Sequence, residues 1–270
     1  MKRVKKINIL LGLLIGLVCF LIWQWPDNRL HLIFCNVGQG DAMLLEYGSY
    51  QILVDAGPDN SVLSCLGKVM PFWDRKLELV VLTHPEADHL TGLIEVVKRY
   101  QVGKLMKTKA EHTTPEFAAL TAALEARRVK VQELMAGDKI KLNQVNLEIL
   151  WPLESTSGVS SSFNQWSTVI LGQYGVFGFL LTGDITETEE QTMINLASLR
   201  PVEVLKVAHH GSKFSSSQKF LEAVRPKLAV ISVGRNSFGH PTPEALARLK
   251  AVGAKVLRTD VAGTIEIVVE

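Results

Sequence analysis

The stretch Thr83-His84-Pro85-Glu86-Ala87-Asp88-His89 places two imidazoles and two carboxylates within six consecutive residues. It follows Leu77–Leu82, an almost continuously apolar run that is typical of a strand buried on both faces. It precedes Leu90–Tyr100, where apolar residues recur at helical spacing. Polar side chains at such a turn are costly to bury unless they bind something. Because carboxylate oxygens and imidazole nitrogens together suit Zn²⁺ or Mn²⁺, the stretch predicts a metal site.

Three later segments carry possible metal ligands where a predicted strand ends. They are Asp184 after Phe177–Leu181, the tandem His209-His210 after Val202–Val207, and His240 after Leu228–Val233. Taken singly, each has an ordinary structural interpretation as a cap, a hydrogen-bond partner or a surface loop residue. Since the carboxyl ends of neighbouring strands gather ligands in such folds, we expect these side chains to meet the first cluster.

The remaining chain alternates predicted strands and helices, which favours two sheets faced by helices. Further strands are expected at Leu30–Val37, Ala42–Tyr47, Tyr50–Val54, near Gln132, and at Leu147–Leu150, Thr168–Leu171, Val256–Leu257 and Ile265–Val269. Further helices are expected at Thr114–Arg127, Glu187–Leu199, Ser217–Ala223 and Pro243–Ala251. The Ser-rich segment Glu154–Gln165 is aperiodic and is expected to form a loop.

Composition excludes several classes of protein. The 270 residues include 29 basic and 27 acidic side chains, and the net charge of +2 does not by itself indicate a polyanion binder. Three cysteines are too few for a disulfide scaffold or a thiolate metal cluster. Cys35 lies in an apolar strand and is expected to be a buried free thiol, although pairing with Cys65 stays open.

The N-terminus predicts a membrane anchor. Four cations between Lys2 and Lys6 precede Ile7–Trp25, an uncharged run just long enough as a helix to cross a hydrocarbon core of about 30 Å. Cations on this side predict a cytoplasmic N-terminus and an exported remainder. A cleaved signal peptide and a buried core helix are the alternatives, but no small-x-small cleavage pattern follows the run. We expect an anchor at residues 1–25, a linker at 26–29 and a folded domain at 30–270.

These motifs resemble the metallo-β-lactamase superfamily. His84, Asp88 and His89 match its His-x-x-x-Asp-His signature, and Gly183-Asp184 and Val54-Asp55-Ala56-Gly57 are similar to its later and earlier aspartate motifs. One branch is closer: Val37–Ala42, His209–Ser212 and Gly239-His240-Pro241 resemble the extracytoplasmic hydrolase domain of the ComEC family of DNA-uptake proteins. The resemblance covers nearly all of residues 30–270. It implies an αββα sandwich with one or two metal ions and phosphodiester or related ester substrates.

The resemblance also implies roles for individual residues. The expected metal ligands are His84, Asp88, His89, Asp184 and one of His209 and His210. In the expected hydrolysis, metal-activated water attacks the ester while Asp88 orients it. The tandem histidine that does not bind metal, or His240, donates a proton to the leaving oxygen. Asp55 is expected to orient a ligating histidine, and His31 to be structural. Candidates to meet substrate phosphate are Lys206, Lys213 and Arg235, and candidates to line the pocket are Asn164 and Ser167.

The chain is thus expected to be a membrane-tethered, extracytoplasmic phosphodiesterase or nuclease using Zn²⁺ or Mn²⁺, with a monomeric catalytic domain. Separate DNA-uptake channel proteins are possible partners, since no other run is apolar enough to form a channel. Two alternatives stay open. A choline-phosphate esterase of teichoic acid uses a similar tandem histidine. A metal-depleted binding domain would explain why Glu86 replaces the usual His or Asp, and why His112 is the only histidine between the first cluster and Asp184.

Overall fold

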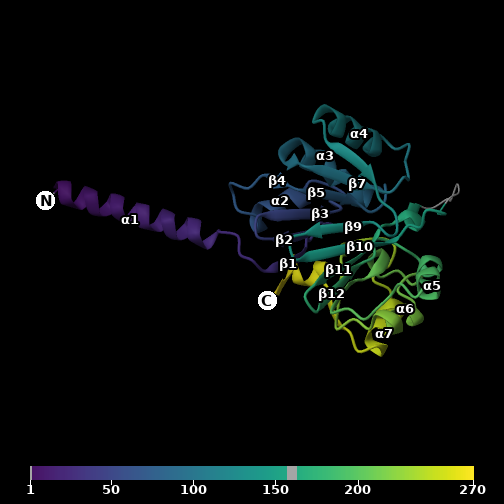
Figure 1. The fold of residues 1–270 in the computed structure, drawn as a ribbon. Helices are drawn as coiled ribbons and strands as arrows, with labels where there is room; N and C mark the ends of the chain where they lie inside the picture. The colour runs from purple at the N-terminus through teal and green to yellow at the C-terminus, as the bar shows by residue number, and fades with distance from the viewer. Residues whose placement is uncertain (1, 157–162) are drawn as a thin grey trace.

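Two seven-stranded β-sheets pack face to face in the computed structural model, which describes residues 2–156 and 163–270 (Figure 1). Helices cover the outer side of each sheet. The predicted αββα architecture of the metallo-β-lactamase fold is therefore confirmed.

The first sheet has the strand order β16-β1-β2-β3-β5-β7-β8. Its strands are β1 (Leu30–Phe34), β2 (Met43–Tyr47), β3 (Tyr50–Val54), β5 (Leu79–Leu82), β7 (Lys104–Lys107), β8 (Lys130–Glu133) and β16 (Ile265–Val269). Pairing is antiparallel from β16 to β3 and parallel from β3 to β8. The parallel pairs put the ends of β3 and β5 at one edge, where the polar clusters follow.

The second sheet has the order β15-β14-β13-β12-β11-β10-β9. Its strands are β9 (Lys139–Leu142), β10 (Val145–Trp151), β11 (Val169–Tyr174), β12 (Phe177–Leu181), β13 (Val204–Lys206), β14 (Leu228–Ile231) and β15 (Lys255–Arg258). Strands β12 to β15 are parallel. A short pair, β4 (Lys76–Leu77) with β6 (Gln101–Val102), lies beside the first sheet.

Helices flank the sheets on both sides (Figure 1). The first sheet carries α2 (Ser61–Val69), α3 (Ala87–Arg99) and α4 (Pro115–Ala126); the second carries α5 (Glu187–Asn195), α6 (Gln218–Val224) and α7 (Pro243–Ala251). Short helical turns are η1 (Phe163–Trp166), η2 (Ala208–Gly211) and α8 (Thr259–Ala262). The hydroxyls of Thr114, Ser217 and Thr242 accept backbone N–H hydrogen bonds and begin α4, α6 and α7.

Alternation along the strands builds the core. In β1, Ile33 packs under the helices of the first sheet, while Leu32 and Phe34 face the second sheet. In β2, Leu44 and Leu45 divide in the same way. Both faces of these strands are thus buried, because each sheet packs against helices on one face and against the other sheet on its other face. This arrangement leaves the strand ends as the place where polar side chains can gather.

Several predicted elements differ from those in the structure. The sequence predicted no helix at α2, and it missed β4, β6, β7 and β9. Helix α3 begins earlier than predicted, at Ala87, so Asp88 and His89 lie in its first turn. The predicted Ser-rich loop is only partly described: residues 163–166 form η1, and residues 157–162 lie outside the described part of the chain.

The N-terminal helix α1 (Lys2–Trp23) stands away from the sandwich, and its Leu13 side chain is 69 % exposed (Figure 1). Within the part of the chain whose side chains the structure describes, no helix is both long enough and apolar enough to cross a membrane.

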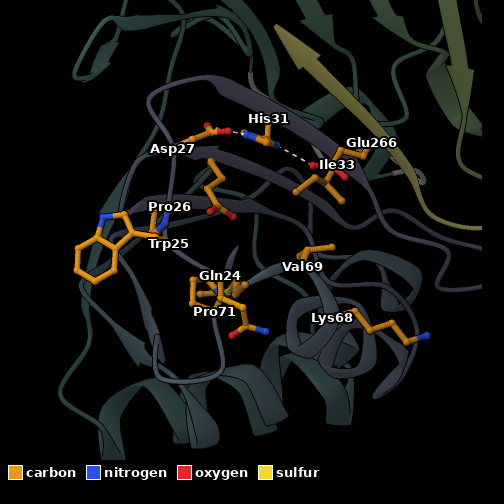
Figure 2. Close-up of a pocket in the computed structure, with 12 residues that line it drawn as sticks. Gln24, Trp25, Pro26, Asp27, His31, Ile33, Lys68, Val69, Pro71 and Glu266 are labelled. Carbon is orange, nitrogen blue, oxygen red and sulfur yellow. Dashed lines mark hydrogen bonds and ion pairs between the residues drawn. The ribbon is translucent and has the colours of Figure 1, made fainter. Parts of the chain in front are cut away.

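The imidazole of His31 contacts one carboxylate in the segment after α1 and one in β16 (Figure 2). Its Nδ1 lies 2.7 Å from Glu266 Oε1 and its Nε2 lies 3.0 Å from Asp27 Oδ1. Burial opposes the charged form of His31, but these two carboxylates outweigh it and raise the pKa of the imidazole.

A cavity of about 220 Å³ adjoins this contact, and Glu46 lines it. Burial raises the pKa of Glu46 to about 7.

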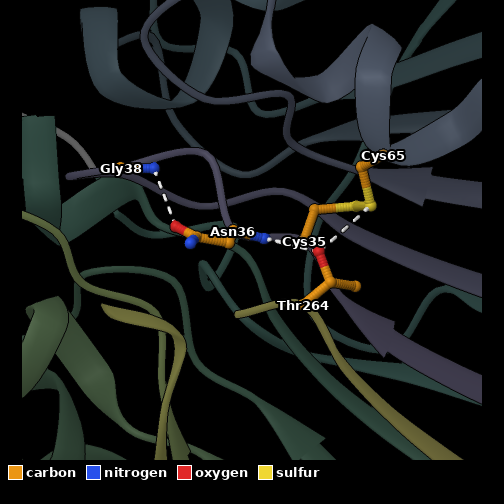
Figure 3. The surroundings of a disulfide bond; sticks show 5 residues. All are labelled: Cys35, Asn36, Gly38, Cys65 and Thr264. Atoms are coloured by element: carbon orange, nitrogen blue, oxygen red, sulfur yellow. Dashed lines mark hydrogen bonds between the residues drawn. A yellow bond between two sulfur atoms is a disulfide. The ribbon is translucent and has the colours of Figure 1, made fainter. Parts of the chain in front are cut away.

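The expected free thiol at Cys35 is wrong, because Cys35 forms a disulfide with Cys65 (Figure 3). Helix α2, which the sequence did not predict, carries Cys65 and brings the two Cα atoms to 5.8 Å. Thr264 Oγ1 donates a hydrogen bond to Cys65 Sγ and accepts one from the backbone N–H of Asn36. The disulfide thus ties α2 to the start of the loop that runs through Gly38 to Asp41.

Candidate metal centre

The first half of the site is built where β3 and β5 end. His84 and His89 are fully buried, with ring centroids 4.1 Å apart. Asp55 follows β3 with a left-handed backbone (φ 57°), and its Oδ2 lies 2.8 Å from His89 Nδ1. The Thr83 backbone N–H and hydroxyl donate hydrogen bonds to the two oxygens of Asp55. Asp55 therefore fixes the ring of His89 with its Nε2 free, as the sequence predicted.

The second half comes from β12 and β13. Asp184 follows Gly183 (φ 51°), where a side chain would put its Cβ 2.9 Å from Ser167 Cβ. The Ser167 hydroxyl accepts the backbone N–H of Asp184 at 3.0 Å. After β13, His210 has a left-handed backbone (φ 54°), and its Nδ1 donates to the Ser232 carbonyl at 2.8 Å. Both side chains thus face the first half of the site.

Four ligand atoms converge between the two halves. Asp88, His89, Asp184 and His210 each offer one nitrogen or oxygen, and these atoms lie within 4.8 Å of one another. Asp184 Oδ2 lies 3.4 Å from His89 Nε2 and 3.3 Å from His210 Nε2, and Asp88 Oδ2 also lies 3.3 Å from His210 Nε2. Of the predicted ligands, these four are brought together.

Orphaned nitrogen atoms test whether the cluster fits a metal ion. The Nε2 atoms of His84, His89 and His210 are buried, and none has a well-directed hydrogen-bond partner. Leaving a buried polar atom unsatisfied costs about 1–3 kcal/mol, so the two in the cluster and the third on the neighbouring His84 are expensive unless they bind a ligand. The mixed nitrogen and carboxylate donors suit a divalent cation such as Zn²⁺ or Mn²⁺. The residues present therefore fit the metal that the sequence predicts.

Electrostatics point in the same direction. Burial disfavours charged His210, but the carboxylates of Asp184 and Asp88 outweigh it and raise its pKa to about 10. Burial would raise the pKa of Asp88, but His89 and His210 lower it to about 2. For His84, burial and the neighbouring His89 hold the pKa well below its usual value. The site therefore carries ionised carboxylates that favour a cation.

Lys206 is not the phosphate-facing cation that the sequence suggested. It is fully buried, and its ammonium group forms an ion pair with Asp41 Oδ2, which is also fully buried. Lys206 Nζ donates to the Gly183 carbonyl at 3.0 Å and lies 3.5 Å from Asp184 Oδ1. It thus holds one oxygen of Asp184, while the other faces the histidines. The reason is that β13 points Lys206 inward, between the loops that carry Asp41 and Asp184.

Asp41 was not predicted as a site residue, although its carboxylate lies 3.6 Å from His210 Nδ1 and 3.9 Å from His89 Nδ1. A signal was present in the sequence, because an acid after two glycines interrupts an otherwise apolar region. Asp41, Asp55 and His89 form a second group with ligand atoms within 4.8 Å. Since Lys206 already pairs with Asp41, we interpret Asp41 as an electrostatic support of the cluster.

A cavity of about 370 Å³ opens onto the cluster, and Asp88, Asp184 and His210 line it. Its other described lining residues are Gln39, Pro58, Glu86, Ala87, His209, Phe238 and His240. His209 Nε2 lies 4.0 Å from Asp184 Oδ2, at the edge of the four-residue cluster. Burial lowers the pKa of His209 and of His240, which favours neutral rings.

Glu86 stands beside His84, with 3.9 Å between Oε2 and Nε2. The other predicted site residues lie further out. His112 stacks on Phe163 with ring centroids 4.2 Å apart and does not join the described metal cluster. Lys213 lies over the ring of Phe214, and Arg235 is exposed. Neither Lys213 nor Arg235 is among the described residues that line the cavity.

Comparisons with known proteins find a family model and several relatives that match this chain. A family model described as the metallo-beta-lactamase superfamily matches residues 35–235. ComE operon protein 3 of Bacillus subtilis (strain 168) is 30% identical over 270 residues, which are 92% of this chain and 34% of that protein. Competence protein ComA of Neisseria gonorrhoeae is 30% identical over 264 residues, 94% of this chain and 34% of that protein. The chain spans about a third of the length of these relatives.

These homologues confirm the predicted resemblance to ComEC-family competence proteins. Among solved structures, the metallo-beta-lactamase fold protein YhfI from Bacillus subtilis is similar with a TM-score of 0.61. The match covers 88% of this chain and 100% of that chain at 13% identity, so it concerns the fold alone.

Proposed function

The chain belongs to the metallo-beta-lactamase superfamily, and on that premise we propose that it is a metal-dependent phosphodiesterase acting on DNA or nucleotides. One observation carries the proposal. The buried Nε2 atoms of His89 and His210 lack well-directed hydrogen-bond partners and converge with the carboxylates of Asp88 and Asp184, and Asp88, Asp184 and His210 line an open cavity. The competence proteins among the homologues favour a substrate related to DNA.

His89, His210, Asp88 and Asp184 would hold the ion, with His84 and Glu86 or His209 available at the edges of the cluster. When bound, a divalent cation would lower the pKa of a water molecule to about 7 and so supply a nucleophile at neutral pH.

The chain's own groups then orient the reactants. Asp88 stays ionised because its pKa is about 2, and its half-buried carboxylate can accept a hydrogen bond from the attacking water. Asp184 is held at Oδ1 by Lys206 and at its backbone by Ser167, so its Oδ2 keeps one direction. His240 at the cavity wall, whose lowered pKa favours the neutral ring, can donate an N–H hydrogen bond to the leaving oxygen.

The test combines metal analysis with hydrolysis. Purified protein should contain Zn²⁺ or Mn²⁺ and should hydrolyse bis-p-nitrophenyl phosphate and single-stranded DNA. His89→Ala should lose the metal and both activities. His112→Ala, which changes a histidine outside the described cluster, is the matched control and should keep them. Cleavage of the small diester but not of DNA would favour a small-molecule or cell-wall esterase, and absence of metal and turnover would refute the proposal.

We further propose that the domain works outside the cytoplasmic membrane, tethered by α1, beside separate DNA-uptake channel proteins. Two observations support this placement. The disulfide between Cys35 and Cys65 is typical of oxidising compartments. The apolar side chains of α1 are exposed, and apolar surface of this extent needs a partner such as lipid. Protease treatment of intact spheroplasts should degrade the domain, and full protection of it would refute the placement.

A further inference from the structure

Phe238 occupies an unusual position, because its ring lines the cavity over the metal cluster and yet is 71 % exposed. Large apolar side chains this exposed are common singly on surfaces and need no explanation there. At the wall of a reactive cavity, however, an open aromatic face offers a binding surface.

The loop that carries Phe238 is built around the side chain of Asn236. Asn236 Oδ1 accepts the backbone N–H groups of Phe238 at 3.1 Å and His240 at 3.0 Å. Its Nδ2 donates to the carbonyls of Gly234 at 2.8 Å and His240 at 2.9 Å. Four hydrogen bonds from one side chain hold both ends of the loop, so the position of Phe238 is fixed before any ligand arrives.

The same loop is fastened to the other side of the cavity. Gly234 packs so closely on the loop before Asp41 that a Cβ there would lie 2.3 Å from the backbone of Gly38. Gln39 Oε1 accepts the Gly234 N–H at 3.3 Å, and Gln39 itself lines the cavity. Phe238 is therefore positioned relative to both halves of the site.

A row of rings leads from Phe238 to the cluster. The Phe238 and His240 centroids are 5.7 Å apart, with planes inclined by 30°. His240 lies 5.6 Å from His209, which lies 6.2 Å from His210. Three ring-to-ring steps therefore separate a planar group stacked on Phe238 from His210, within the same cavity. A strand whose phosphate lies at the cluster can place one of its bases on Phe238, and the exposed Arg235 of the same loop offers a cation for its backbone.

We propose that Phe238 is a stacking platform for a nucleobase of the strand whose phosphodiester lies in this cavity. The proposal rests on the proposed function and narrows it to single-stranded nucleic acid or nucleotides, whose bases are free to stack. A quaternary ammonium group such as choline also binds aromatic rings, but it is recognised by cages of several rings. Phe238 is the only Phe, Tyr or Trp among the described residues that line this cavity.

Paired oligonucleotides test the proposal. The full-length, metal-loaded protein is titrated with phosphorothioate-linked single strands, which resist hydrolysis, and binding is followed by fluorescence anisotropy. One strand carries all its bases and the other is abasic. Phe238→Ala should raise the Kd of the base-bearing strand by about 5- to 150-fold and that of the abasic strand by less than about twofold. Phe238→Trp should retain the affinity.

Phe214→Ala is the matched control, because Phe214 is 65 % exposed and is not among the described residues that line the cavity. It should leave both Kd values unchanged. Equal losses on the two strands, or no loss on either, would overturn the proposal. So would displacement of the base-bearing strand by phosphocholine but not by thymidine monophosphate.

The outcome separates the two proposals. DNA hydrolysis without a base-dependent effect of Phe238→Ala overturns the stacking platform alone. A base-dependent effect in a protein that hydrolyses no diester supports the platform and refutes the proposed enzymatic function.

Discussion

Replacing Lys206 with methionine tests the buried ion pair beside the metal cluster. The substitution keeps an unbranched side chain of similar length but removes the ammonium group that pairs with Asp41 and contacts Asp184. Both Lys206 and Asp41 are fully buried. Removing one partner of a buried pair leaves an uncompensated charge and costs about 3–5 kcal/mol, a large part of a typical unfolding free energy of about 5–15 kcal/mol.

The measurement is urea unfolding of the metal-free protein at neutral pH, so that no bound cation replaces the lost ammonium. Lys206→Met should lower the midpoint without changing the slope. Lys213→Met, the same change at an exposed position nearby, should cost less than about 0.5 kcal/mol. The double variant Lys206→Met/Asp41→Asn should recover part of the loss, because the unpaired charge is gone. A loss below about 1 kcal/mol for Lys206→Met, or a double variant less stable than the single one, would refute the reasoning.

Three further changes have defined outcomes. Asp55→Asn removes the carboxylate that holds His89 Nδ1 and should weaken metal binding by about 10- to 100-fold in calorimetric titrations; unchanged affinity would contradict the orienting role. Because the pKa of Glu46 is raised from 4.5 to about 7, the folded state binds the extra proton, so stability should fall by about 3 kcal/mol as pH rises from 4.5 to 7. Glu46→Gln should abolish that decline in urea unfolding at pH 4.5 and 8, and an unaltered pH profile would exclude Glu46 as its source. Cys35→Ser opens a loop with a sequence separation of 30 residues and should cost about 3–4 kcal/mol in thermal or urea unfolding, whereas no loss would argue against the disulfide.

Periodicity and strand-end polarity made much of the fold predictable. Leu77–Leu82 and the helical spacing after it located β5 and α3, and the acids and histidines that follow apolar runs located the site. Helix α2 could not be found in this way. It is short, and its glycine and serine residues weaken the periodic signal, so Cys65 was not expected near Cys35.

Directions of side chains were harder to predict than positions of elements. Lys206 sits next to the tandem histidine in sequence, which suggested a role at the substrate, but the pleat of β13 turns it into the interior. The choice between His209 and His210 could not be made from sequence, because both follow the same strand. Left-handed backbone angles at both residues send His210 into the cluster and His209 to the cavity wall.

The pairing of β1 with β16 affects when the domain can complete its fold during synthesis. Leu30 to Phe34 align with residues 265–269, and His31 reaches Glu266 across a separation of 235 positions. Until β16 arrives, β1 presents an open edge, and contacts so remote in sequence form slowly. Since β1 leads directly into the loop that carries Asp41, this side of the site would stay unformed in a nascent chain. Such a delay would keep the hydrolase site incomplete until β16 has been synthesised.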